Sequence, residues 1–188
     1  MNTISFMTAN YVARQIDYNM TKGWMEGDDA TNAWFAPIDT YEARFGDMLD
    51  EIKGLGFDAI DLWLGQLNWR WATDEHIAIA KQALQARGLA VSSLAGWFGD
   101  TREEFTAACK MADALDVRIL GGNTGLLAKG DHAGLADIAR VYNVCLGYEN
   151  HPEHNTQEMY DKIGQGFEDV IGFCVDTGWF GTFGYDAP

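Results

Sequence analysis

The sequence predicts an α/β fold, namely a (β/α)8 TIM barrel that is incomplete, with about six strand–helix units in a single domain over residues 1–188. Two observations support this prediction. Short apolar runs alternate with amphipathic stretches along the whole chain, and most of the apolar runs end in polar or aromatic side chains. The first pattern is typical of βαβ units, and the second is typical of a barrel whose site draws on several strand ends.

Six apolar runs are predicted to be buried parallel strands. They begin near Ile4, Phe57, Leu89, Val117, Val144 and Val170. The successive spacings are 53, 32, 28, 27 and 26 residues. All but the first suit βαβ units of about 30 residues.

The stretches between these runs carry the start signals of helices. Three pairs have capping-box spacing, in which Glu follows a polar cap by three residues: Asp39 with Glu42, Thr101 with Glu104, and Asn155 with Glu158. One apolar stripe marks the first of these helices, formed by Phe45, Met48, Leu49, Ile52 and Leu55. Helix ends are predicted at Gly54, Gly56 and Gly88.

The long first interval contains the segment Asp17–Ile38, which is rich in Gly, Asn, Asp, Trp and Met. Loops of this length inside a compact domain usually serve as lids or binding loops. We therefore expect this segment to be a loop that lies over the active face.

A doubly wound open sheet is the alternative architecture for six βα units. Nucleotide-binding sheets of that kind usually carry a glycine-rich phosphate loop after the first strand, whereas Thr8–Val12 contains no glycine. The expected strand ends instead carry polar and aromatic groups, in the stretches that contain Asn10, Asp61-Leu62-Trp63, Gly96-Trp97-Phe98, Gly121-Gly122-Asn123, Glu149-Asn150-His151 and Asp176-Thr177-Gly178-Trp179. This distribution favours the barrel.

The charge and the composition of the chain restrict the classes of partner that it could bind. The net charge is −15, from 13 basic and 28 acidic residues spread along the chain, which disfavours nucleic acid as a partner. The N-terminus lacks the features of a signal peptide, and no window approaches the roughly 18 apolar residues of a membrane span. Cys109, Cys145 and Cys174 read as small core residues. We expect a cytoplasmic protein with no membrane partner.

Two neighbouring strands are predicted to end at carboxylates. The run Val144–Tyr148 leads into Glu149, and the run Val170–Val175 leads into Asp176. Because the carboxyl ends of parallel strands meet at one edge of a sheet, the two carboxylates would lie together where α/β proteins carry out chemistry. The pair resembles half of a metal site.

With these segments the chain resembles the sugar phosphate isomerase/epimerase family, the xylose isomerase-like TIM barrels. The matching stretches are Gly56–Trp63, Ile119–Asn123, Leu146–His151 and Val175–Trp179. In that family a divalent metal is typically held by a Glu ending strand five, a ligand ending strand six, a His from strand seven and a Glu from strand eight. The resemblance implies that Glu149 and Asp176 are the first two ligands. It also implies a metal that suits hard oxygen ligands, Mn²⁺ or Mg²⁺, with Co²⁺ or Zn²⁺ as alternatives.

The resemblance has limits along this chain. A full barrel takes about 250 residues, and the ligands of strands seven and eight have no counterpart here. We expect a truncated sequence of a longer protein that stops where helix six should begin. A natural minimal form that closes by self-association, a homo-oligomer, is the alternative. Gln66 stands where many relatives have a His just after strand two, which argues against a multi-zinc endonuclease. Trp179 stands where ketose epimerases of the family often have a substrate-binding His, which argues against a strict ketose 3-epimerase.

The predicted reaction is isomerisation or epimerisation of a small-molecule sugar or polyol by proton transfer through a metal-stabilised enediolate. Glu149 is the predicted ligand and catalytic base, and Asp176 is the second ligand. Substrate contacts are expected from His151, Asn150, Trp63, Trp97, Asn123, Asn10 and Trp179.

Each of these assignments has a structural alternative. Glu149 could pair with a neighbouring Lys or Arg, Asp176 could cap a helix, and the asparagines could form turns. His151 could be a loop residue without a role, and the tryptophans could fill the core. Asp61 is predicted to be either a site residue or salt-bridged, since a buried unpaired acid is costly.

Two other functions stay open beside the isomerase or epimerase. A lyase or dehydratase on the same scaffold would share the enediolate chemistry. An inactive carbohydrate-binding product would follow from the truncation, because only two of the usual four ligands are present.

Overall fold

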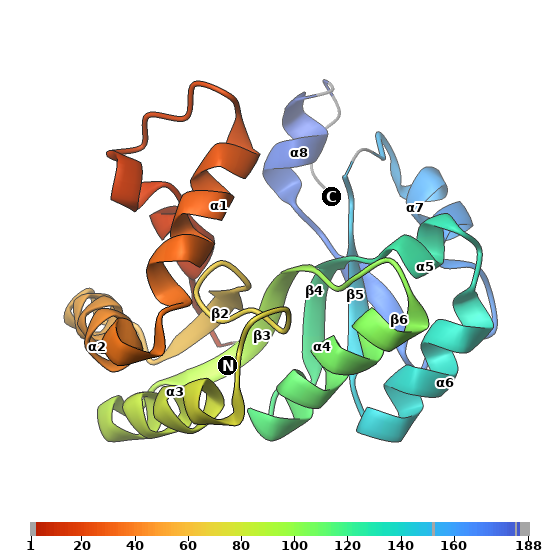
Figure 1. Ribbon diagram of the computed structural model, residues 1–188. Coiled ribbons are helices and arrows are strands. Elements are labelled where there is room, and N and C mark those ends of the chain that lie inside the picture. Colours follow the sequence, from red (N-terminus) through yellow and green to blue (C-terminus); the bar gives the residue numbers. More distant parts are fainter. Residues whose placement is uncertain (1–2, 152, 183, 185–188) are drawn as a thin grey trace. The chain divides into compact units, whose positions relative to one another are not determined.

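The computed structural model describes residues 3–151, 153–182 and 184. The chain divides into two compact units, residues 1–95 and 96–188. Six parallel strands alternate with helices along the chain, which confirms the predicted α/β class and the incomplete (β/α)8 barrel (Figure 1). Each unit is built from three strands and the helices between them.

The first unit holds most of the expected elements close to their expected places. They are β1 (Phe6–Met7), the 3-10 turns η1 (Thr8–Tyr11) and η2 (Arg14–Ile16), α1 (Trp24–Phe35), α2 (Ile38–Gly54), β2 (Ala59–Trp63), α3 (Asp74–Arg87) and most of β3 (Ala90–Trp97). Strand β2 pairs in parallel with β1 and with β3. Helices α2 and α3 lie side by side (Figure 1), and Arg87 of α3 joins them by donating to both carboxylate oxygens of Asp50 on α2.

The predicted stripe of α2 is the face that this helix buries. Phe45, Met48, Leu49 and Ile52 are at most 5% exposed, whereas Leu55, at the C-cap, is 59% exposed. Helix α2 begins at Ile38 after Pro37, and no side chain caps it, so the predicted Asp39 cap is wrong. Pro37 fixes its own φ at −71°, but its side chain has no acceptor for the first amides of the helix.

The expectation of a loop over Asp17–Ile38 is also wrong, because twelve of its residues form helix α1. Tertiary contacts hold this helix. The hydroxyl of Thr31, which is fully buried, donates to the Gly27 carbonyl and accepts from the Ala13 amide. Asn32 accepts from the indole of Trp71 at 2.9 Å. The bonds from Ala13 and Trp71 come from residues distant in sequence, which a local pattern does not reveal.

The second unit continues the alternation. It contains α4 (Arg102–Ala114), β4 (Ile119–Asn123), α5 (Gly125–Ala128), α6 (His132–Tyr142), β5 (Cys145–Glu149), α7 (Thr156–Ile163), β6 (Ile171–Cys174) and α8 (Thr177–Thr182). Strand β5 pairs in parallel with β4 and with β6. Helix α8 begins at Thr177, three positions after the last residue of β6. A helix therefore starts earlier than the last residues of the chain, where we expected helix six to begin.

Two of the predicted caps lie in this unit and are confirmed. The Thr101 hydroxyl accepts from the Glu104 amide, and the Asn155 carbonyl oxygen accepts from the Glu158 amide. In both cases the Glu carboxylate reaches one residue before the cap, to the amides of Asp100 and His154 respectively. The helix boundaries in this part of the chain therefore follow from local sequence.

The ends of β3 and β4 come together at a pair of glycines. Gly122 has φ of 144°, and a Cβ there would collide with the Gly96 carbonyl oxygen. Gly96 itself has φ of 143°. The neighbouring residues Trp97 and Asn123 are thereby brought to the ends of their strands without a side chain between the two backbones.

All three cysteines are free thiols. Cys109 is buried in α4, and burial raises the pKa of its thiol to about 12. Cys145 and Cys174 are half-buried rather than fully buried as expected. Over residues 3–151, 153–182 and 184, no helix combines the length and the apolar character needed to cross a membrane.

Candidate functional site

The carboxyl ends of β5 and β6 bring the two predicted ligands onto neighbouring strands. Glu149 is the last residue of β5 and lies opposite Cys174, the last residue of β6. Asp176 follows two residues later. The Asn150 side chain bridges the two segments, because its Nδ2 donates to the Asp176 carbonyl at 2.9 Å and its Oδ1 accepts from the Asp176 amide at 2.6 Å. Asn150 is fully buried, so it supports the strand ends and does not face a substrate.

The electrostatics of Glu149 reflect its surroundings. Burial raises the pKa of the Glu149 carboxyl, the charge of Asp176 raises it further, and His151 lowers it. Asp176 is exposed, and its Oδ1 accepts from the Trp179 amide at 3.1 Å, as the N-cap of α8 does. The helix-cap alternative for Asp176 is therefore present in the structure, alongside its place next to Glu149.

His151 and Trp179 form an aromatic pair beside Glu149. Their ring centroids are 3.9 Å apart at an angle of 48°, and the His151 amide donates to the Glu149 carbonyl at 2.9 Å. The His151 ring is exposed. Trp179 lies in the first turn of α8, so the expectation that it ends a strand is wrong.

Two further predicted contacts lie in the second unit. Asn123 ends β4, is half-buried, and donates from Nδ2 to the Glu149 carbonyl at the long distance of 3.5 Å. Trp97 ends β3 and is 41% exposed, which leaves a large aromatic face open to solvent. Both residues thus stand at strand ends, as expected.

The remaining predicted contacts, Asn10 and Trp63, lie in the first unit. Asn10 is exposed in η1 and donates to the Met7 carbonyl at 2.9 Å, which matches the turn-forming alternative. Trp63 ends β2 and donates from Nε1 to Asp28 on α1 at 2.7 Å. Burial raises the pKa of Asp28, and the Trp63 bond opposes that rise.

The sequence interpretation missed Asp28 and its neighbour Trp24, which packs edge-on against Trp63 at 5.9 Å. The i, i+4 spacing of Trp24 and Asp28 would have suggested a shared helix face, had the segment been recognised as helical.

Asp61 forms no salt bridge with any of the described residues, so that alternative is wrong. Its carboxylate accepts from the hydroxyl of Ser5 and from that of Ser93, the latter at 2.8 Å. Two hydroxyl donors satisfy a half-buried carboxylate without a cation. Gln66 is likewise satisfied, because it exchanges hydrogen bonds with the hydroxyl and carbonyl of Thr8.

A pocket of about 390 Å³ lies in the first unit, and none of its lining residues is a predicted site residue. Its lining residues are Tyr11, Arg14, Gln15, Trp34, Phe35, Arg44, Asp47, Met48 and Glu51. Two guanidinium groups stack on aromatic rings there, Arg14 over Tyr11 and Arg44 over Trp34.

The donor set at the strand ends fits part of a metal site. Glu149 and Asp176 offer carboxylate oxygens, which hard divalent cations prefer. The charge of Asp176 raises the pKa of Glu149, which marks two like charges that a cation would neutralise. Within the described part of the chain, no group of three or more His, Cys, Asp or Glu side chains could hold a metal ion. The two carboxylates thus fit two positions of a coordination shell.

The parallel strands with acidic residues at their ends define a class of α/β barrel, and the comparison with solved structures agrees. The IolI protein with a bound zinc atom matches at a TM-score of 0.56 and 17% identity, over 73% of this chain and 59% of that chain. D-psicose 3-epimerase in the presence of D-fructose matches at 0.54 and 16%, over 73% and 60%. A xylose isomerase-like TIM barrel protein from Mycobacterium smegmatis in complex with magnesium matches at 0.65 and 16%, over 100% and 70%.

These matches show the fold. The chain has the fold of the xylose isomerase-like TIM barrels, as its sequence predicted, and it spans about three-fifths of the length of the first two structures. No protein-family model matches the sequence, and no curated protein matches it either.

Proposed function

We propose that this protein acts in a metal-dependent isomerisation or epimerisation of a sugar or a related polyol. One observation carries the proposal: the carboxylates of Glu149 and Asp176 stand at the ends of adjacent parallel strands, and the buried Asn150 amide ties those ends together. Strand ends of this kind are where barrels carry out chemistry. The similar structures support the proposal, since they include an epimerase studied with D-fructose and proteins that hold zinc or magnesium.

The residues have distinct roles in this proposal. Glu149 and Asp176 would hold the cation through their carboxylate oxygens. A divalent cation bound there supplies Lewis acidity toward a carbonyl and a neighbouring hydroxyl oxygen. The Glu149 carboxylate could also take a proton from the carbon beside the carbonyl.

The surrounding groups would bind and orient the substrate. The exposed ring of His151, backed by Trp179, offers a flat surface for the apolar face of a sugar, and Trp97 offers a second one. Asn123 is a further proposed contact in the second unit. Asn150 supports the site, because its side-chain amide forms hydrogen bonds with the main chain of Asp176.

The test measures metal retention and proton exchange separately. The chain is dialysed with Mn²⁺, and the retained metal is counted. It is then incubated in D₂O with a panel of ketoses and inositols, and deuterium incorporation is followed by NMR. We expect Glu149→Gln and Asp176→Asn each to retain less metal and to lose exchange, since both residues are proposed ligands. Glu103→Gln, an exposed acid on α4, should change neither. Wild-type protein that retains no metal and exchanges no proton would rule out the proposal.

A second candidate is a carbohydrate-binding protein without turnover. It is favoured by the presence of only two carboxylates at the strand ends of the described residues. The same experiment separates the two candidate functions, since a carbohydrate-binding protein without turnover would bind a sugar but would not exchange its protons for deuterium. A lyase or dehydratase would instead yield a product that has lost one molecule of water.

A further inference from the structure

Glu153 is a buried carboxylate in the loop after β5, and the proposed chemistry does not use it. Its side chain lies four residues beyond Glu149 and the residue is 7% exposed. Its Oε1 accepts a hydrogen bond from the Tyr148 hydroxyl at 2.7 Å. Tyr148 is itself 3% exposed, and burial together with Glu153 raises the pKa of its phenol.

The Tyr148–Glu153 bond closes a short loop around Glu149. Tyr148 and Glu149 are consecutive residues of β5, so their side chains point to opposite faces of the sheet. Glu149 therefore lies, in sequence, between the two residues that this buried hydrogen bond joins.

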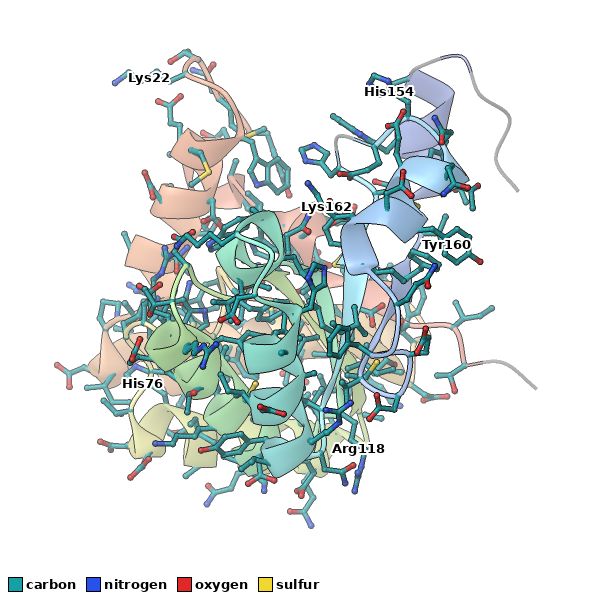
Figure 2. All side chains as sticks on the ribbon, turned by 90° about the vertical axis from the view of Figure 1, so that its right-hand side faces the viewer. Lys22, His76, Arg118, His154, Tyr160 and Lys162 are labelled. Carbon is teal, nitrogen blue, oxygen red and sulfur yellow. The ribbon has the colours of Figure 1, made fainter. Side chains whose placement is uncertain are left out.

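A cation completes the arrangement from a neighbouring helix. Lys162 extends from α7 (Figure 2), and its Nζ lies 3.9 Å from Glu153 Oε1. The Lys162 side chain is 39% exposed, whereas that of Glu153 is 8% exposed. The ammonium group can therefore keep its hydration while it offsets the charge of the buried carboxylate.

The second carboxylate oxygen makes this arrangement unusual. Glu153 Oε2 is buried, and none of the described residues donates a hydrogen bond to it. An unsatisfied buried acceptor costs about 1–3 kcal/mol. Replacing a buried polar pair with apolar groups is often neutral or stabilising. Packing alone therefore gives no reason for a half-satisfied carboxylate at this position.

Other residues of the segment after β5 contact the main chain of the two candidate metal ligands, Glu149 and Asp176. The His151 amide donates to the Glu149 carbonyl, and Asn150 holds the main chain of Asp176. Two carboxylates that repel each other move apart unless the backbone is restrained. The Tyr148–Glu153–Lys162 cluster supplies such a restraint on the Glu149 side.

We propose that Glu153 is a positioning residue, which holds the loop against Tyr148 and Lys162 so that Glu149 stays beside Asp176. The role of Glu153 in metal binding rests on the proposed function, whereas its contacts with Tyr148 and Lys162 do not depend on that function. Partners that orient metal ligands typically contribute about 10- to 100-fold to metal affinity.

The test compares variants of the cluster by three readouts: the Mn²⁺ dissociation constant, the hydrogen exchange rate of the His151 amide, and the Tm. We expect Tyr148→Phe, Glu153→Gln and Lys162→Met to weaken Mn²⁺ binding about tenfold and to speed exchange at His151. Lys162→Arg should restore wild-type behaviour. Tyr160→Phe is the matched control, because Tyr160 is an exposed tyrosine on α7.

The outcomes are separable. Variants that lower the Tm but leave the Mn²⁺ affinity and the His151 exchange rate unchanged would overturn the inference, since the cluster would then only stabilise the fold. If the wild-type chain binds no Mn²⁺, the proposed function fails. The positioning role of Glu153 is then judged from the hydrogen exchange rate of the His151 amide alone. Unchanged exchange in both Tyr148→Phe and Glu153→Gln would then reject the positioning role.

Discussion

Glu149 combines three conditions that seldom occur together at one carboxyl group. It ends a parallel strand, it is partly buried, and it has a second acid close enough to affect its ionisation. Both burial and the charge of Asp176 favour the protonated form of Glu149. The fold therefore keeps this side chain in place at the expense of stability once the carboxyl is ionised.

This gives a pH-dependent prediction for Glu149→Gln. A carboxyl whose pKa is raised in the folded state holds its proton more tightly there than in the unfolded state. The free energy of unfolding thus falls as the pH rises from the ordinary pKa of about 4.3 through the raised value, and the loss is complete above it. Glu149→Gln should raise the Tm at neutral pH, by on the order of 2 °C.

The Tm of wild type and variant should converge well below the ordinary Glu pKa of about 4.3, where the Glu149 carboxyl is protonated in both the folded and the unfolded state. Scanning calorimetry across this pH range measures the difference. A variant that is less stable than wild type at neutral pH would show that an unidentified partner stabilises the Glu149 carboxylate.

Residues at strand ends could be predicted from the sequence, whereas the residues that hold them could not. Glu149 and Asp176 follow apolar runs directly, so a local pattern locates both. The roles of Asn150 and Glu153 depend on bonds to Asp176 and Tyr148. For Asn150 that bond crosses from one strand to the next, and for Glu153 it depends on how the loop folds back, so the sequence shows neither.

Helix α1 shows where local patterns fail at the scale of an element. Gly27, Asp28, Asp29, Thr31 and Asn32 all have modest or poor helix propensity, and no side chain caps the helix at Gly23. The helix is held by contacts with Ala13, Trp63 and Trp71 instead. Tertiary contacts outweigh propensity in this segment.

Helix caps offer a direct test of which local signals carry energy. Thr101→Ala removes a hydroxyl that accepts from the Glu104 amide, and should lower the free energy of unfolding by about 1 kcal/mol. Asp39→Ala changes a residue with the same sequence signal but without a capping bond, and should cost only a few tenths of a kcal/mol. Urea denaturation of both variants measures the difference. Equal losses would contradict the capping assignment.

The fold as a whole was predictable because its period is regular. Spacings of 26 to 32 residues between apolar runs match the βα repeat, and the strands are found where the runs predicted them. The positions of Glu149 and Asp176 at the ends of the fifth and sixth strands followed from the same repeat.

The net charge of −15 leads to a prediction about salt for the whole chain. Exposed ion pairs such as Arg102–Asp131 and Arg140–Asp169 weaken when salt screens them. The repulsion among excess carboxylates weakens too, and with so large an imbalance this second effect should dominate. Raising NaCl from about 20 mM to about 500 mM should therefore raise the Tm by about 3 °C. Thermal melts at both concentrations test this, and a fall in Tm would mean that the ion pairs dominate.

The Asn150 amide has a consequence for engineering. The side chain bonds both the carbonyl and the amide of Asp176, so it replaces a pair of backbone hydrogen bonds between the segments that follow β5 and β6. Aspartate there would lose the donor, and any apolar residue would leave two backbone groups without partners. His151, the next residue, presents an exposed ring. A mutagenesis library aimed at new substrates should therefore leave position 150 unchanged and vary position 151.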